Sequence, residues 1–473
     1  ASLAASPTAS GAGAADSGGG LAEPDRLWLI ALLCCCGAVE GADIALLPSS
    51  LFALQADLGL RPDELACMAL WQGLLQVLMA PLWGILADRG ILTRRSILTI
   101  GCAGWGVATV LLGLISSWIP MLLLRACNGM MLACLRPISN GLVPDIVPSD
   151  RRGQIYGWIQ ISLDFGALFG SLATTPLSGM VIHNIYGWRL AFMVVGTSSL
   201  VLSSLVWTTM KEPLTHSAVP SKEGDQPLLE EMRRLVGYLR TPTFSLLVLQ
   251  GVFGSVPWNA LGYLPLYLQT SGLTASRAAV VTALGQASQG FGHLLGGCLG
   301  DVAARLSPAR GRVVVAQISV FCGIPLLWLF FVGFPPGPEN FAGYCVAISL
   351  YGLTSTWCGA GVNWPIFTEI VPAEGRSAVV AWDTALEGVS GAVLGNVMVA
   401  GLAEWRFGYR LSDAANMATA GNARALGEAL ACTTLAPFII CFVIYSALHW
   451  SYPHDAQIAA GRSKHATEAC KEQ

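Results

Sequence analysis

Charged residues are scarce in this sequence. Asp, Glu, Lys and Arg make up only 12% of its 473 residues, whereas 54% are hydrophobic and the mean hydropathy is +0.59. A soluble domain carries about a quarter charged residues, so most of the surface of this chain cannot face water. The formal net charge of −3 argues neither for nor against a nucleic-acid partner, but the apolar composition excludes one. We therefore predict an integral membrane protein that crosses the bilayer many times.

The sequence also lacks the short motifs of common nucleotide-binding and hydrolytic sites. No stretch matches G-x-x-x-x-G-K-[ST], H-E-x-x-H or G-x-S-x-G, and "CLGD" at 298–301 lacks the first Gly of a G-x-G-D intramembrane protease. The 14 cysteines include no C-x-x-C pair with a matching His or Cys pair. We expect buried free thiols, no metal, no cofactor and no enzyme activity.

Long apolar runs dominate what is present. A helix needs about 20 apolar residues to cross a bilayer. Twelve runs meet this length, at 27–54, 65–87, 96–117, 119–143, 153–180, 187–209, 244–270, 276–300, 312–334, 341–367, 378–404 and 427–450. We predict an all-α protein with five segments: a disordered 1–26, a six-helix bundle 27–210, a central loop 211–243, a second bundle 244–450 and a polar tail 451–473.

The placement of Lys and Arg predicts the orientation. If the N-terminus is cytoplasmic, fourteen Lys and Arg residues fall in cytoplasmic loops and six in the loops of the other side. Cytoplasmic loops carry an excess of these residues. Both termini are therefore expected in the cytoplasm.

The two halves of the chain repeat one another. "PDIVPSDRRGQIYGW" at 144–158 aligns with "TEIVPAEGRSAVVAW" at 368–382, which places Asp145 on Glu369 and Arg152 on Arg376. Each half also has a Gly followed four residues later by Asp, at 84–88 and at 297–301. Such a repeat predicts two pseudo-symmetric six-helix bundles, an architecture that suits alternating access to a central site.

The stretch "GILADRGILTRR" at 84–95 resembles the loop 2–3 motif of the major facilitator superfamily, roughly G-x-L-A-D-R-x-G-R-R. Gly84, Asp88 and Arg89 match it in position, and Arg94 and Arg95 follow after a slightly longer turn. The resemblance covers about residues 27–450 and implies a twelve-helix transporter fold.

Within that superfamily, "RACNGMMLACLRPISNGLVPDIVP" at 125–148 and "NWPIFTEIVPAEGRS" at 363–377 resemble a plant, algal and oomycete group distantly similar to spinster-like lipid transporters. The spinster pattern has Gly-x-Gly-Glu-Ala in helix 4. This chain reads Gly129-Met130-Met131-Leu132-Ala133 there, without the Glu, which weakens any inference of lipid transport.

The resemblance implies a gate at the cytoplasmic side. Asp88 could pair with Arg152 or with backbone N–H groups of a neighbouring helix, and so hold the two bundles together. The alternative is that the Arg residues only fix the topology. The candidate gate residues are Gly84, Asp88, Arg89, Asp145, Arg152, Asp301, Glu369 and Arg376.

Three charges inside the first bundle are candidates for a central site. Glu40 and Asp43 lie three residues apart, on one face of the helix that the run 27–54 predicts. Arg136 lies in the fourth run. In the superfamily the first and fourth helices line the central cavity, so these side chains could converge there and bind a proton or an anion. A static ion pair between the two helices is the alternative.

Trp258, Asn259, Asn363 and Trp364 are candidate solute contacts. They lie in Pro- and Gly-rich parts of the seventh and tenth runs, and an amide beside an indole suits an amphipathic or ring-shaped solute. Ordinary kinked packing is the alternative. Asp164, Asp383 and Glu387 are further intramembrane acids, which could gate or couple. Asp383 is close to the start of its predicted helix, so a solvated cap residue is the alternative there. His293 has no evident partner and is expected to be packed.

These observations predict a secondary transporter of a small organic solute, coupled to protons through Glu40 and Asp43 and working as a monomer in the lipid bilayer. A uniporter, or a transporter-like sensor that binds a solute without moving it, is the alternative. Sensors of this sort usually add long cytoplasmic extensions, and the predicted loop and tail leave little room for one.

Overall fold

The computed structural model describes residues 22–88, 91–147, 152–212, 237, 239–370, 383, 385–410 and 419–471. The predicted 1–26 and 211–243 segments lie mostly outside these residues. Of the predicted tail, residues 451–471 are described, and they continue the last helix.

The first half folds into helices that begin and end where the local sequence favours it. Pro24 lies at the start of α1, and Gly59 ends the helix in the left-handed conformation with φ 65°. Thr93 caps α3 by accepting a hydrogen bond from Ser96 N. The helices are α1 (Glu23–Leu58), α2 (Pro62–Asp88), α3 (Arg94–Leu114), α4 (Trp118–Leu132), α5 (Leu135–Ile146), α6 (Arg152–Ser178) and α7 (Gly187–Thr209). A short hairpin, β1 (Val181–Ile182) and β2 (Ile185–Tyr186), joins α6 to α7.

The second half contains helices with wider turns. Its α-helices are α9 (Pro242–Ala260), α10 (Leu264–Thr270), α11 (Ala275–Leu306), α12 (Gly311–Trp328), α13 (Phe341–Thr354), α14 (Trp364–Ile370), α16 (Met398–Gly401) and α17 (Ala420–Lys471). Single 3₁₀ turns are η1 (Leu261–Tyr263) and η3 (Pro338–Asn340). Four π-helical turns, η2 (Leu329–Gly333), η4 (Gly359–Asn363), η6 (Gly391–Val397) and η7 (Leu402–Arg406), lie in this half. Such turns often occur at functional sites.

Nine helices in the described part of the chain are long and apolar enough to cross a membrane. The predicted run 119–143 is one of them, but it is broken at Ala133–Cys134 into α4 and α5. Pro137 follows in the first turn of α5, where its missing N–H costs little. The helices α6, α11 and α13–α14 are not among the nine, although they fall in predicted runs.

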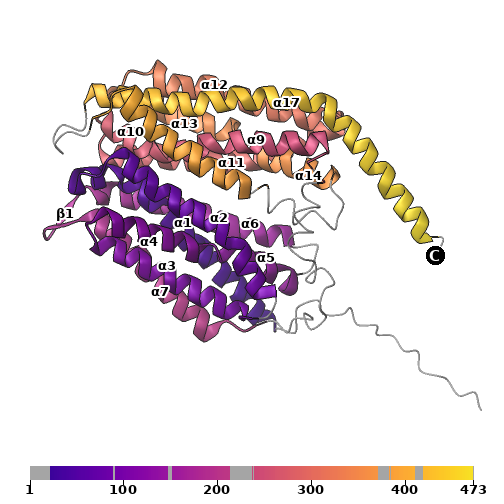
Figure 1. Ribbon diagram of the computed structural model, residues 1–473, viewed down its shortest axis with the longest axis horizontal. Coiled ribbons are helices and arrows are strands. Elements are labelled where there is room, and N and C mark those ends of the chain that lie inside the picture. The colour runs from indigo at the N-terminus through magenta and orange to yellow at the C-terminus, as the bar shows by residue number, and fades with distance from the viewer. Residues whose placement is uncertain are drawn as a thin grey trace, which may run out of the picture.

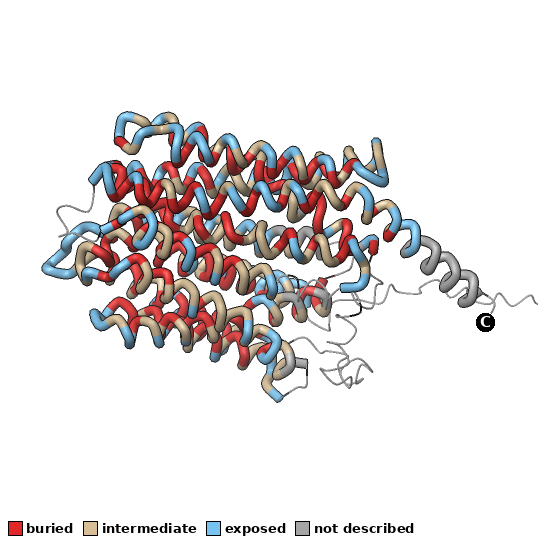
Figure 2. Tube along the Cα trace, turned by 45° about the horizontal axis from the view of Figure 1, so that its top comes forward, coloured by how far each residue is buried: buried red, intermediate tan, exposed pale blue. Residues whose placement is uncertain are grey.

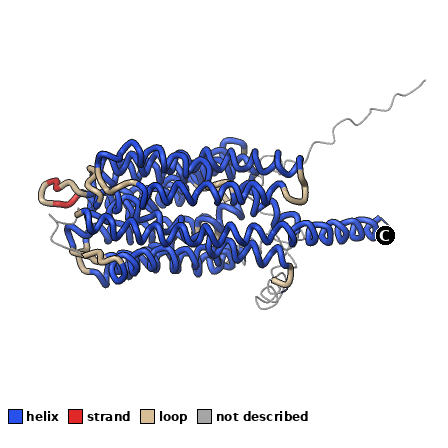
Figure 3. The backbone as a smooth tube through the Cα atoms, turned by 90° about the horizontal axis from the view of Figure 1, so that it is seen from above, coloured by secondary structure: helices blue, strands red, loops and turns tan. Residues whose placement is uncertain are grey.

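The helices form two bundles that lie side by side. The helices α1–α7 make the first bundle and α9–α17 the second (Figure 1). All run roughly along one axis, with the β1–β2 hairpin at one end and α17 extending past the other (Figure 3). We call these the hairpin end and the tail end.

The apolar core joins the bundles at the hairpin end. One buried cluster includes Leu46 and Leu54 of α1 together with Tyr263, Leu264 and many other residues of the second bundle. A second cluster, around Leu33, lies in the tail half of the first bundle and includes no buried residue of the second. Buried positions follow the inner faces of the helices in both bundles (Figure 2). Across the boundary α6 packs on α11, α2 on η6 and α1 on α10.

The cysteines in the described part of the chain are free thiols. Cys36, Cys102, Cys134 and Cys441 are buried, but four others have exposed side chains, so the expectation of buried thiols holds only in part.

Candidate functional site

Asp43 lies at the centre of a buried polar network in the first bundle. Its side chain is 0% exposed, although it sits well inside the apolar helix α1. Thr109 of α3 donates to its Oδ1 atom at 3.0 Å, and Asn128 of α4 donates to the two carboxylate oxygens at 3.3 and 3.4 Å. Gln72 of α2 donates to Asp43 Oδ2 at 3.4 Å and to Asn128 Oδ1 at 2.7 Å. Three neighbouring helices therefore supply the hydrogen bonds that a buried carboxylate needs.

Arg125 of α4 is the basic residue of this network, and it was not among the predicted site residues. Its side chain is 2% exposed, and its Nη2 atom donates to Gln72 Oε1. Its Nε and Nη1 atoms have no hydrogen-bond partner among the described residues, and its charge interacts with that of Asp43. Arg125 is the one charged residue between 119 and 135. Because a charge inside an apolar run is costly and usually marks a functional residue, its position in the sequence could have identified it.

Glu40 lies three residues before Asp43 and is also buried. The charges that act on it are those of Arg136 and Asp43. Arg136 of α5 has an exposed side chain and forms no direct hydrogen bond with Glu40 among the described residues. The three predicted residues thus lie in one region. Within it, the charge of Arg136 acts on Glu40, and the charge of Arg125 interacts with that of Asp43.

A second polar network occupies the other bundle. Asn363 of η4 donates to Gln250 Oε1 of α9 at 2.8 Å, and Tyr445 of α17 donates to Asn363 Oδ1 at 2.9 Å. Glu387 packs against α9, because a Cβ atom on Gly251 would lie 2.3 Å from its Oε1 atom. Both networks link the first and fourth helical passes of their halves. The one in the first bundle is charged, whereas the Gln250–Asn363–Tyr445 set is neutral.

The other predicted solute contacts do not join Asn363. The side chain of Asn259 packs against η6, where a Cβ atom on Gly391 would lie 2.3 Å from its Nδ2 atom. The ring of Trp258 lies 5.6 Å from that of Tyr351. Trp364 is 54% exposed. The structure therefore places the four residues in four separate environments.

The predicted gate residues that are described form charge pairs inside each bundle. In the first bundle Arg94, at the start of α3, donates to Gly141 O at 3.0 Å and pairs with Asp145. A methyl group on Gly84 would lie 3.8 Å from Pro137 Cβ, an ordinary contact, so α2 and α5 do not require a glycine there.

The second bundle repeats this arrangement. Arg312, at the start of α12, donates to Gly361 O at 3.0 Å and to Asp301 at 3.2 Å. It also lies 3.7 Å from Glu369, which accepts a hydrogen bond from Tyr452. Arg94 and Arg312 are equivalent partners that the sequence analysis did not include among the gate residues. Neither pair connects the two bundles in this conformation.

The remaining gate residues lie beyond what the structure describes. Asp88 ends α2 and Arg152 begins α6, but their side chains are not described, and Arg89 and Arg376 lie outside the described residues. The predicted contact of Asp88 with Arg152 stays a prediction.

Among the described residues, two hydrogen bonds join the bundles to each other. Tyr409 donates to Gln55 Oε1 of α1 at 3.0 Å. Ser171 of α6 donates to Gln286 Oε1 of α11 at 3.0 Å. Both bonds lie toward the hairpin end, as does the shared apolar cluster. The structure is therefore a conformation closed at the hairpin end.

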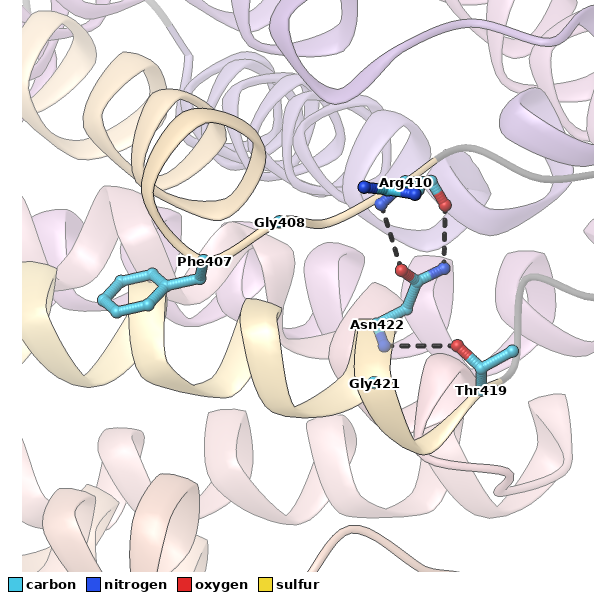
Figure 4. Close-up of a pocket in the computed structure, with 6 residues that line it drawn as sticks. All are labelled: Phe407, Gly408, Arg410, Thr419, Gly421 and Asn422. Carbon is cyan, nitrogen blue, oxygen red and sulfur yellow. Dashed lines mark hydrogen bonds between the residues drawn. The ribbon is translucent and has the colours of Figure 1, made fainter.

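A shallow pocket of about 350 Å³ opens at the hairpin end (Figure 4). The side chain of Asn422, which lines this pocket, is hydrogen-bonded to the backbone of Arg410: Oδ1 accepts from Arg410 N at 3.0 Å and Nδ2 donates to Arg410 O at 2.9 Å. These bonds fasten the segment after η7 to the start of α17, and we assign no solute to this pocket.

A helical membrane protein with two similar bundles, a buried charge network and paired charges at one end belongs to the class of solute transporters rather than enzymes. The chain is a member of the Major Facilitator Superfamily, whose family model matches residues 33–395. This confirms the predicted family and the predicted fold class.

Comparison with known proteins gives relatives of the same family. Multidrug resistance protein MdtG of Citrobacter koseri is 27% identical over 275 residues, which are 55% of this chain and 63% of the relative. The chain thus matches less than two thirds of that relative's length. A solved bacterial homolog of the human lysosomal transporter Spinster superposes with a TM-score of 0.76 at 19% identity, covering 92% of this chain and 99% of that one. A D-xylose-proton symporter superposes with a TM-score of 0.66 at 14% identity, covering 88% and 97%. These two likenesses establish the fold.

Proposed function

We propose that this chain is a proton-coupled transporter that moves a small organic solute by alternating access. The observation that carries the proposal is the buried Asp43–Arg125 network with Glu40 beside it. A carboxylate and a guanidinium inside a bilayer helix bundle are costly, and such groups usually mark a proton or solute pathway.

The network provides chemistry for exchanging one proton. Two carboxylates three residues apart repel each other when both are charged, so a proton shared by Glu40 and Asp43 relieves that repulsion. When Asp43 is protonated it no longer balances the charge of Arg125. The uncompensated guanidinium charge then attracts an anionic group of a solute, and the two nitrogens that have no hydrogen-bond partner among the described residues can donate to it. Proton and solute binding would be linked through this one guanidinium.

The orientation of the chain in the membrane determines which side is closed in this conformation. With the tail end in the cytoplasm, as the Lys and Arg distribution predicts, this conformation is closed on the opposite side. Closure at the tail end would then be the task of the loop motif, through Asp88, Arg89, Arg152 and Arg376. We propose that the working unit is a monomer in the bilayer.

The names of these related proteins mention multidrug resistance, a sugar and protons, and they support only the broad class of small organic solutes. The first experiment is a thermal-shift screen of the purified chain at about pH 5.5 and 7.5 against sugars, amino acids, organic acids, nucleosides and lysolipids. A ligand that binds the folded state raises the melting temperature.

A hit is then tested for uptake into proteoliposomes with and without an inward proton gradient. Accumulation that requires the gradient, and that Asp43→Asn and Glu40→Gln abolish, supports the proposal. Glu428→Gln, which removes an exposed carboxylate at the hairpin end, is the control and should leave uptake unchanged. Equilibrating, gradient-independent uptake indicates a uniporter. Binding without uptake indicates a sensor.

A further inference from the structure

The boundary between α6 and α11 contains an ionisable residue on each side. Asp164 lies on α6 of the first bundle and His293 on α11 of the second. The charge of each acts on the other. His293, expected to be packed without a partner, therefore faces an acid of the opposite bundle.

The register of the two helices explains why these residues face each other. Ser171 donates to Gln286 Oε1 at 3.0 Å across the boundary. The helix α6 ends at the hairpin end and α11 begins there, so the two run antiparallel. Asp164 lies seven residues before Ser171, and His293 seven residues after Gln286. Seven residues are two turns, about 10.5 Å along each helix, so both side chains return to the same boundary nearer the tail end.

The boundary opens at this level. A Cβ atom added to Gly290 or to Gly297, which lie one turn either side of His293 on its face, would meet no atom within 4 Å. Asp164 and His293 form no direct hydrogen bond or salt bridge in the described part of the structure; the recorded partner of the carboxylate is Gln160 Nε2 at 3.1 Å. The two side chains are thus close enough to interact through their charges without being in hydrogen-bond contact in this conformation.

Several other charged groups near these two helices have interactions elsewhere. Around α6, Asp43 and Glu40 face the first-bundle networks, and Arg189, Asp145 and Arg136 interact with Asp57, Arg94 and Glu40 respectively. Around α11, Arg312 binds Asp301. Apart from Arg312, the titratable side chains of α10, α12 and α13, which pack against α11, are tyrosines and cysteines, residue types that are ordinarily uncharged near neutral pH: Tyr267, Cys322, Tyr344, Cys345 and Tyr351.

We propose that Asp164 and protonated His293 form an ion pair between the bundles when the tail end closes, so that acidic pH favours the tail-closed conformation. The proposal rests on the alternating access proposed above. Histidine changes charge near neutral pH, so the pair is present below the pKa of His293 and is lost as the pH rises through it. One ion pair of this kind should change the ratio of the two conformations about three- to tenfold.

The test is a distance measurement between the bundles at the tail end. Spin labels attached through genetically encoded noncanonical residues at Ile91 and Leu306, both exposed, leave the native cysteines in place. Pulsed electron resonance in nanodiscs between about pH 5 and 8.5 reports the populations. In the wild type the short-distance population should grow about three- to tenfold relative to the long one as the pH falls.

Four variants make the test specific. His293→Asn and Asp164→Asn should each abolish that change, whereas the double exchange Asp164→His with His293→Asp should restore it. Ser171→Ala, which removes the neighbouring uncharged bond, should raise the tail-closed population at every pH and keep the titration. The same dependence on His293 should persist in Asp43→Asn.

A wild-type titration that survives His293→Asn or Asp164→Asn would overturn the proposal. A chain that moves, but with no pH dependence, overturns it as well and leaves alternating access intact. A single unchanging distance in every variant overturns both this proposal and alternating access.

Discussion

Replacing Tyr409 by Phe should shift the chain toward opening at the hairpin end. The Tyr409 hydroxyl donates to Gln55 Oε1 across the two bundles at 3.0 Å, and the two side chains are 4% and 2% exposed. The Nε2 atom of Gln55 has no hydrogen-bond partner among the described residues. Within that part of the chain, the side chain of Gln55 is therefore held by the hydrogen bond from Tyr409 alone. In the hairpin-closed state the variant leaves the Gln55 carbonyl buried and unpaired.

The magnitude follows from that unpaired group. A buried polar atom without its partner costs about 1–3 kcal/mol, whereas water satisfies the same atom once the hairpin end is open. The penalty therefore falls on one conformation alone. It should shift the ratio of the two states by about 5- to 150-fold toward the hairpin-open one. Labels at Val181 and Trp405, exposed on opposite bundles at this end, should report a longer distance.

Tyr445→Phe is the matched control. It removes the same hydroxyl from a buried hydrogen bond, 2.9 Å to Asn363 Oδ1, that lies inside the second bundle. It should lower the melting temperature without changing the Val181–Trp405 distance distribution. If Tyr409→Phe leaves the populations unchanged, or moves them no more than Tyr445→Phe does, the hydrogen bond across the boundary does not hold the hairpin end closed.

Three further substitutions test the interior and the tail end. Asp43→Asn removes the charge that balances a buried guanidinium and should destabilise the fold by about 3–5 kcal/mol, seen as a lower melting temperature in nanodiscs; an unchanged value contradicts the buried pair. Gly166→Ala places a Cβ atom 1.9 Å from Ala38 O, so α1 and α6 must separate and the yield of monodisperse protein should fall sharply; normal yield means the helices do not pack this closely. Asp145→Asn weakens a partly exposed ion pair with Arg94 inside one bundle and should lower the free energy of unfolding by less than about 1 kcal/mol. A large fall in the melting temperature would show that this pair stabilises the fold more than a partly exposed pair is expected to.

The sequence repeat predicted which acids would be equivalent, and their partners follow the same symmetry. Asp145 and Glu369 align at the ends of matching helices, and each receives an arginine from the start of the third helix of its half. A local motif determines this arrangement, because the members of each pair lie at or near helix ends. Arg94 and Arg312 could have been found by extending the alignment to the loop after each Gly–Asp segment.

Contacts between helices distant in sequence could not be predicted in this way. Spacing within a helix shows that Glu40 and Asp43 share a face, but it does not show which neighbour that face meets. The arginine whose charge interacts with Asp43 proved to be Arg125, whereas the predicted Arg136, eleven residues later in the chain, interacts with Glu40. The approach of Asp164 to His293 depends on the register between two helices in different bundles. The residue pattern of either helix alone does not predict that register.

The apolar cluster that the two bundles share has a thermal consequence. Opening the hairpin end exposes part of this cluster to water, and exposed apolar surface adds heat capacity, about 0.45 cal/(mol·K) for each Å². The other cluster belongs to the first bundle alone, so the described structure holds no equivalent shared core at the tail end. Hydrophobic contact weakens on cooling. Cold should therefore favour the hairpin-open state, and a plot of the logarithm of the population ratio against inverse temperature should curve.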